Sequence, residues 1–238
     1  PIGNALDHGI GGVAGDNFGM VRGVEVVLPN GEVLRTGMGA VPGSKLWQNY
    51  HYGFGPYIDG IFSQSNFGIV TKMGFWLVPQ PEVQTSFFVS SFKTDDLHPM
   101  IEIVQQLRQQ GLLYSSGGGS PIRSANNSQD GADSAHIPEV KALLSRRDGG
   151  SPGEWDALGR QKNIPVSAAQ GGLRGPAKVV QATIDHAKDL FSKVPGATFR
   201  QGTTFHFPLN PDNVDESERS FVGIPNLWAF SRMAVQGT

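Results

Sequence analysis

The chain has 238 residues, which is long enough for one large domain or two of ordinary size, each with its own core. Its 19 basic and 21 acidic side chains nearly cancel and form no basic tract, which argues against a nucleic-acid partner. The absence of cysteine excludes disulfides, thiolate catalysis and cysteine-ligated metal sites. No apolar run is long enough to predict a membrane-spanning helix.

Two strand-rich segments stand out in the first third of the chain. Residues 21–28 and 32–35 flank Pro29-Asn30-Gly31, and Asn-Gly between β-branched runs is the signal of a two-residue hairpin in which both turn residues take positive φ. Residues 67–77 are rich in strand-favouring residues and end before prolines, which predicts a buried strand. The preceding residues 52–60 are spaced by glycines, so their backbone can approach a flat or bulky ligand.

The pattern changes after Pro81, which predicts a second domain. Residues 85–92 predict a strand, and Asp95 or Asp96 can cap a helix that ends at Gly111. The stretch that follows, rich in serine, glycine and asparagine, contains one expected helix near residues 138–146.

A helical stripe returns over residues 176–193 with proline in its first turn, and a strand is expected over residues 197–207. The order strand, helix, helix, strand predicts an α+β sandwich of ferredoxin-like type, with the helices on one face of an antiparallel sheet.

Common catalytic and nucleotide motifs are missing from the sequence. Gly117-Gly118-Gly119-Ser120 lacks the continuation of a phosphate loop and is interpreted as a flexible loop, and Gly9-Ile10-Gly11-Gly12 follows no clear strand. No Gly-x-Ser-x-Gly elbow supports acyl transfer. The six histidines are scattered without metal-ligand spacing, so surface or structural roles are favoured and no metal site is predicted.

Asp16 lies between glycines just ahead of the strand predicted at residues 21–28. On local grounds alone, an Asx turn or a loop carboxylate that caps backbone amides is favoured over catalysis. Asp59 has the same interpretation, as a helix or turn cap, and there we keep it.

Several segments together resemble the vanillyl-alcohol oxidase and p-cresol methylhydroxylase family of FAD-linked 4-alkylphenol oxidases. The segments are Gly3–Gly9, Gly15-Asp16, Gly23–Glu32, Arg35–Gly39 and Tyr52–Leu77, with a thinner likeness later at Gly223-Ile224-Pro225. The resemblance implies an α+β chain in which residues 1–81 are the C-terminal half of a p-cresol-methylhydroxylase-type FAD-binding domain. Residues 82–238 would be a ferredoxin-like cap, the substrate domain, incomplete at its C-terminal end. We therefore interpret the chain as an internal fragment of a longer protein, which leaves its compartment open.

The resemblance also implies a reaction. Members bind a para-substituted phenol, pass a hydride from its benzylic carbon to flavin N5, and leave a quinone methide that water can attack. The expected cofactor is FAD, with any covalent link made by a residue outside this sequence and by none of the six histidines. Molecular oxygen or an electron-transfer protein would reoxidise the flavin, and a homo-oligomer is expected.

Within this resemblance, Gly15-Asp16 matches the position of a catalytic aspartate, so Asp16 becomes the expected base. A carboxylate suits that role because hydration of a quinone methide requires a group that takes a proton from water. We expect the backbone near Asn4, Gly15 and Ile69 to contact FAD, with the Ile69 side chain in the core. The residues before Asp16 lack the aromatic stretch of close relatives, so the pocket and the substrate can differ. Two alternatives stay open: a flavin dehydrogenase or hydroxylase that passes electrons to a cytochrome or another protein acceptor, and a non-catalytic binding or structural module.

Overall fold

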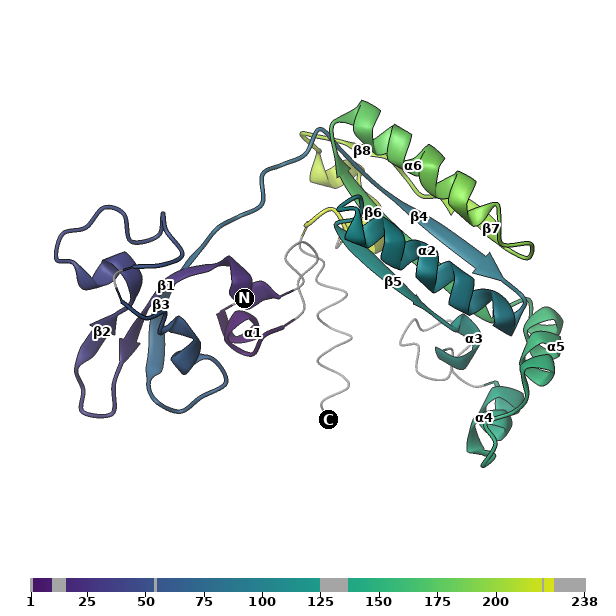
Figure 1. Ribbon diagram of the computed structural model, residues 1–238, viewed down its shortest axis with the longest axis horizontal. Helices are drawn as coiled ribbons and strands as arrows, with labels where there is room; N and C mark the ends of the chain where they lie inside the picture. The colour runs from purple at the N-terminus through teal and green to yellow at the C-terminus, as the bar shows by residue number, and fades with distance from the viewer. Residues whose placement is uncertain (1, 10–15, 54, 125–136, 220, 225–238) are drawn as a thin grey trace. The chain divides into compact units, whose positions relative to one another are not determined.

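The structure is a computed structural model that describes residues 2–9, 16–53, 55–124, 137–219 and 221–224. The chain divides into two compact units, Pro1–Pro79 and Gln80–Thr238 (Figure 1). The division falls two residues before the boundary expected from the sequence. The roles of the units as half of an FAD-binding domain and as a cap remain predictions. Within the described ranges, no helix is both long and apolar enough to cross a membrane.

The first unit is built on a three-stranded antiparallel sheet. The strands are β1 (Val21–Val27), β2 (Val33–Arg35) and β3 (Ile69–Phe75), in the order β2-β1-β3. Short helical segments pack around this sheet: α1 (Ile2–Leu6), η1 (Asn17–Met20), η2 (Gly37–Ala40) and η3 (Asp59–Phe62). The buried core consists of Ala5, Phe18, Val21, Val24, Val26 and Phe62.

The predicted hairpin is present, with Val27 opposite Val33, but its turn is not the expected one. Of the turn residues only Gly31 has positive φ, at 85°. The Leu28 amide donates to the Glu32 carbonyl at 2.9 Å, and the Gly31 amide donates back to the Leu28 carbonyl at 2.8 Å. The connection is therefore a three-residue loop in which Gly31 alone takes the left-handed conformation.

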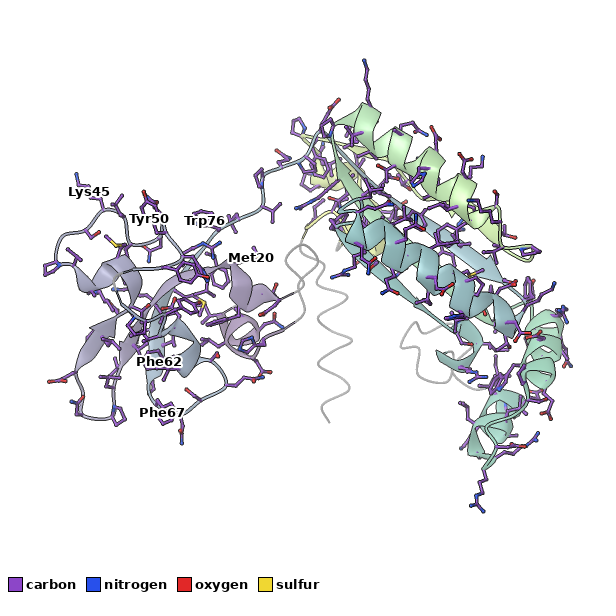
Figure 2. All side chains as sticks on the ribbon, viewed as in Figure 1. Met20, Lys45, Tyr50, Phe62, Phe67 and Trp76 are labelled. Carbon is purple, nitrogen blue, oxygen red and sulfur yellow. The ribbon has the colours of Figure 1, made fainter. Side chains whose placement is uncertain are left out.

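The prediction of a buried strand at residues 67–77 is wrong in its burial. Ile69 is 73% exposed, Phe67 61% and Leu77 84%, and Figure 2 shows Phe67 at the surface of the first unit. Only the inward side of β3 contributes to the core, through partly buried Val70, Met73 and Phe75. β3 is an edge strand, and its exposed side chains, Ile69, Thr71 and Lys72, are not among the residues that reach the core of this unit.

The second unit has the predicted α+β architecture. Its strands are β4 (Val83–Ser91), β5 (Ser115–Gly119), β6 (Ser167–Gly175), β7 (Thr198–Gln201) and β8 (Phe205–His206), and its long helices are α2 (Leu97–Gln109) and α6 (Ala177–Phe191). The antiparallel order β5-β6-β4-β7, with β8 beside β4, is the strand order of a ferredoxin-like sandwich. Both long helices lie on one face of the sheet (Figure 1).

The apolar stripes of the two helices build the main core of this unit. Met100, Val104 and Leu107 of α2 and Val180, Ile184, Ala187 and Phe191 of α6 pack on Phe87, Val89, Ala169 and Leu173 of the sheet. The rings of Phe87 and Phe191 lie 5.6 Å apart. A smaller core around Trp155 joins α3 (Pro121–Ser124), α4 (Pro138–Ser145) and α5 (Pro152–Lys162), while η4 (Thr94–Asp96), η6 (Pro211–Asn213) and α7 (Glu216–Arg219) complete the described elements.

Two expectations for the second unit are corrected. The glycines at residues 117–119 are not a flexible loop but belong to β5, which pairs with β6 through Gly118 and Ala169. A Cβ on Gly118 would lie 2.3 Å from Cδ1 of Ile101, so glycine lets α2 approach this strand closely. The strand expected at residues 197–207 is divided into β7 and β8.

Candidate active site

Asp16 stands at the entrance to η1 and caps it. Its Oδ1 accepts a hydrogen bond of 2.8 Å from the Phe18 amide, so the capping role expected on local grounds is present. The side chain remains 47% exposed, and its second oxygen, Oδ2, points away from the cap toward His8. One oxygen is thus held by the backbone, and the other faces His8.

His8 links Asp16 to Ser63. Its Nδ1 lies 3.3 Å from Asp16 Oδ2, and its Nε2 lies 3.0 Å from Ser63 Oγ. The imidazole also packs beside Phe18, with ring centroids 4.9 Å apart. Sequence reasoning missed this group because Ser63 is 55 residues away from His8, and no spacing rule connects them.

The residues expected to contact the cofactor are only partly brought together. Asn4 lies near Asp16, because its Oδ1 accepts a hydrogen bond from the side chain of Asn17 and its carbonyl accepts one from the Gly9 amide at 2.8 Å. Gly15 lies outside the described residues. Ile69 begins β3 opposite Val27 and has no described contact with Asn4 or Asp16.

The glycine-spaced segment of residues 52–60 contains Asp59, whose side chain is buried at 2% exposure, and Tyr57 close to it. The expectation that Asp59 caps a helix or turn is wrong, because its side chain does not cap the helix η3 in which it lies. Instead, Asp59 accepts a hydrogen bond of 3.2 Å from the Gly23 amide of β1. Burial, followed by the nearby Asp59 charge, raises the pKa of Tyr57 to about 12. These residues fix the loop to the sheet, and Tyr57 stays a neutral phenol at physiological pH.

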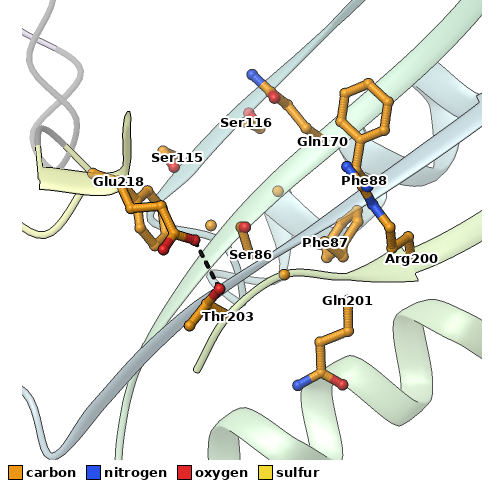
Figure 3. Close-up of a pocket in the computed structure, with 14 residues that line it drawn as sticks. Ser86, Phe87, Phe88, Ser115, Ser116, Gln170, Arg200, Gln201, Thr203 and Glu218 are labelled. Carbon is orange, nitrogen blue, oxygen red and sulfur yellow. Dashed lines mark hydrogen bonds between the residues drawn. The ribbon is translucent and has the colours of Figure 1, made fainter. Parts of the chain in front are cut away.

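The second unit contains a cavity of about 530 Å³ on the face of its sheet opposite α2 and α6 (Figure 3). Phe88 of β4 is paired with Gln170 of β6 and Arg200 of β7, so these three side chains lie in a row across the strands. Glu218 of α7 accepts a hydrogen bond of 2.7 Å from the Thr203 hydroxyl at the cavity rim. This volume and this mixture of aromatic and polar groups suit a small polar aromatic ligand.

A smaller hollow of about 230 Å³ shares Phe88 and Gln170 with the larger cavity. Its remaining wall is formed by Gly118, Gly119 and Ala168, together with Ser120, Pro121 and Ala169. Backbone therefore supplies much of this surface.

The remaining histidines form no metal centre in the described part of the chain, where no group of three His, Asp or Glu side chains could hold an ion. His98 faces Glu102 one turn later on α2 at 3.5 Å, and both side chains are exposed.

The chain is similar to flavoproteins of known sequence and structure, although no protein-family model matches it. It is 36% identical over 182 residues to the 4-cresol dehydrogenase [hydroxylating] flavoprotein subunit of Pseudomonas putida, covering 70% of this chain and 34% of that protein. It is 40% identical over 116 residues to the 1'-carboxy-chondrochloren decarboxylase of Chondromyces crocatus, covering 48% of this chain and 21% of that protein.

Two solved structures share the fold of the chain. A substrate-bound p-cresol methylhydroxylase matches 98% of this chain and 43% of its own, at 30% identity and a TM-score of 0.70. A 4-ethylphenol oxidase from Gulosibacter chungangensis, in complex with isoeugenol, matches 94% of this chain and 42% of its own, at 28% identity and a TM-score of 0.69. The chain spans about a third of the length of the P. putida flavoprotein. These similarities confirm the resemblance seen in the sequence: over most of its length the chain is related to flavoproteins of the p-cresol methylhydroxylase type.

Proposed function

We propose that this chain is part of an FAD-dependent oxidoreductase that oxidises para-substituted phenols at the benzylic carbon. The observation that carries the proposal is the similarity of both units to p-cresol methylhydroxylase, across 98% of this chain. The half-exposed carboxylate of Asp16 also supports the proposal, because such a reaction requires a base that takes a proton from water.

The first unit fits part of an FAD site. The outer edge of β3 is unpaired among the described strands, so backbone N–H and C=O groups beginning at Ile69 are available to a nucleotide. Ile69, being 73% exposed, would present an apolar side chain beside those groups. Asn4 offers an exposed side chain next to the Asp16 loop. These residues would hold the cofactor, and the link that makes a covalent flavin would come from elsewhere in the protein.

FAD, when bound, supplies the acceptor for the hydride that leaves the benzylic carbon. In our proposal the substrate left behind is a quinone methide, and Asp16 takes a proton from the water that adds to its benzylic carbon. The water oxygen forms the new C–O bond, the water proton moves to Asp16 Oδ2, and the substrate returns to a phenolate. The Oδ1 cap keeps the carboxylate oriented throughout, because the Phe18 amide is fixed by the helical turn.

The side chains that line the cavity of the second unit favour a phenolic ligand in our proposal. Phe88 offers a ring for aromatic contact, while Gln170 and Arg200 offer hydrogen-bond donors on either side of it. We assign this sheet face to the substrate.

The electron acceptor separates the main proposal from its alternative. The name of the P. putida protein, a dehydrogenase subunit, favours electron transfer to a partner protein such as a cytochrome, whereas the G. chungangensis protein is named an oxidase. Anaerobically reduced enzyme mixed with oxygen or with a cytochrome would distinguish them, since only the physiological acceptor should reoxidise the flavin within the turnover time. That the protein forms a homo-oligomer remains a prediction, and light scattering of the full-length protein, which measures its molar mass in solution, can test it.

The test of the proposed function uses the full-length protein. We expect it to purify with flavin absorbance and to lose that absorbance under anaerobic conditions when 4-ethylphenol is added. 3-Ethylphenol is the matched control, because a meta-alkyl phenol cannot form the quinone methide. A colourless protein would favour the non-catalytic alternative, and equal reduction by both isomers would contradict the proposed mechanism.

A further inference from the structure

Each ring nitrogen of His8 has a side-chain partner, one from a nearby residue and one from a residue 55 positions away in the sequence. Nδ1 faces Asp16 Oδ2 at 3.3 Å, and Nε2 faces Ser63 Oγ at 3.0 Å. Phe18 packs against the ring on a third side. His8 also has a φ of 53°, a left-handed conformation that is unusual for a residue other than glycine. The left-handed φ belongs to the end of α1, where the His8 amide donates to the Ala5 carbonyl at 3.2 Å and the Gly9 amide donates to the Asn4 carbonyl at 2.8 Å. The inference therefore rests on the two contacts of the ring nitrogens.

The donor and acceptor capacities decide which nitrogen carries the proton. An ionised carboxylate only accepts hydrogen bonds, so Nδ1 must be protonated to bind Asp16. The Ser63 hydroxyl has two partners within reach, His8 Nε2 at 3.0 Å and the Gly60 carbonyl at 2.8 Å. It can donate to Nε2 when that nitrogen is bare and to Gly60 when Nε2 carries a proton. Ser63 therefore accommodates every form of His8 that keeps a proton on Nδ1.

We propose that His8 is a positioning residue for the base, and that it acts by donating from Nδ1 to Asp16 Oδ2. Together, the Phe18 amide on Oδ1 and His8 on Oδ2 hold both oxygens of the carboxylate in fixed directions. The carboxylate then meets the attacking water in one orientation, which is the usual contribution of a third group to a base. This inference rests on the proposed function for its kinetic consequence, but its hydrogen bond exists independently of turnover.

Two substitutions separate the nitrogens of His8. In His8→Asn the amide nitrogen can replace Nδ1 and keep the bond to Asp16, and asparagine tolerates the left-handed conformation well. In His8→Gln the longer side chain places its amide nitrogen near the position of Nε2, where it can reach Ser63 but not Asp16. We expect the Asn variant to retain kcat within about threefold. We expect the Gln variant to lose about 10- to 100-fold in kcat at an unchanged KM, as for the removal of one charge-assisted hydrogen bond.

The control is His98→Gln, which removes an exposed histidine of α2 that also faces a carboxylate. It should leave kcat, KM and melting temperature unchanged. Equal kcat in the Asn and Gln variants would overturn the positioning role, as would a Gln variant whose loss is entirely in KM.

A spectroscopic measurement reads the hydrogen bond without turnover. In full-length protein labelled with ¹⁵N-histidine, the His8 signals, assigned by their loss in His8→Asn, should show a protonated Nδ1. They should show a bare Nδ1 if the inference is wrong. The two proposals therefore fail separately: protein that 4-ethylphenol does not reduce contradicts the proposed function, whereas a bare Nδ1 in active protein contradicts only the role of His8.

Discussion

Replacement of Asp16 by asparagine tests the proposed base with little disturbance of the fold. The asparagine Oδ1 can still accept the 2.8 Å hydrogen bond from the Phe18 amide, and asparagine is as good a helix N-cap as aspartate. Stability should therefore change by less than about 0.5 kcal/mol. What is lost is the proton acceptor. Removing a positioned acid–base group costs about 10²- to 10⁴-fold in rate, or about 3 to 5 kcal/mol of activation free energy.

Asp16→Ala supplies the comparison, because it removes the cap as well as the base. It should be as slow as Asp16→Asn, but less stable by about 0.5 to 2 kcal/mol. The assay measures kcat with 4-ethylphenol, together with thermal melting of each variant. Wild-type turnover in Asp16→Asn would remove Asp16 from the mechanism. If turnover instead followed melting temperature across the two variants, the carboxylate would be structural only.

The remaining predictions concern stability. Hydrogen bonds from Arg35 and, to a smaller extent, Lys72 hold the pKa of the Glu25 carboxyl below its usual value. The ionised carboxylate therefore stabilises the folded first unit fully above about pH 4.3, the pKa of a glutamate in the unfolded chain. This stabilisation is lost as the pH falls through the lower pKa of the folded state. Glu25→Gln should therefore flatten the acid side of a stability–pH profile measured by denaturant unfolding. Gly171→Ala should destabilise the second unit by about 1 to 3 kcal/mol in the same assay, because its Cβ would lie 2.5 Å from the buried ring of Phe87. Ser151→Ala should cost about 0.5 to 2 kcal/mol, since Ser151 and Glu154 form a reciprocal capping box on α5; an unchanged unfolding midpoint would contradict it.

The ferredoxin-like unit could be predicted because its long elements have strong periodic signals. The apolar stripes of α2 and α6 and the alternation in β4 are properties of neighbouring residues, and each persists over several turns or residue pairs. β5 could not be predicted in the same way. A run of serine and glycine has no side-chain pattern, and Ser115–Gly119 becomes a strand only because β6 provides a partner.

The candidate site shows a similar limit. The sequence around Asp16 predicts its cap, which depends on an amide two residues away, and this bond is present. It does not predict the contact with His8, because that contact depends on how α1 and η1 fold against each other. The apolar neighbours of Ile69 predict a side chain in the core, yet Ile69 is exposed, because composition does not reveal that β3 lies at the edge of its sheet.

Gly118 and Gly119 of β5 form part of the wall of the smaller hollow, and this has a consequence for the evolution of the protein. At Gly119 no atom lies within 4 Å of the place that a Cβ would occupy, so a methyl group there would displace nothing. Substitutions at this position would narrow the hollow beside Phe88 without disturbing the packed helices on the other face of the sheet. Single substitutions of Gly119 would therefore reduce the space beside Phe88 for the proposed phenolic substrate while the core of the unit stays unchanged.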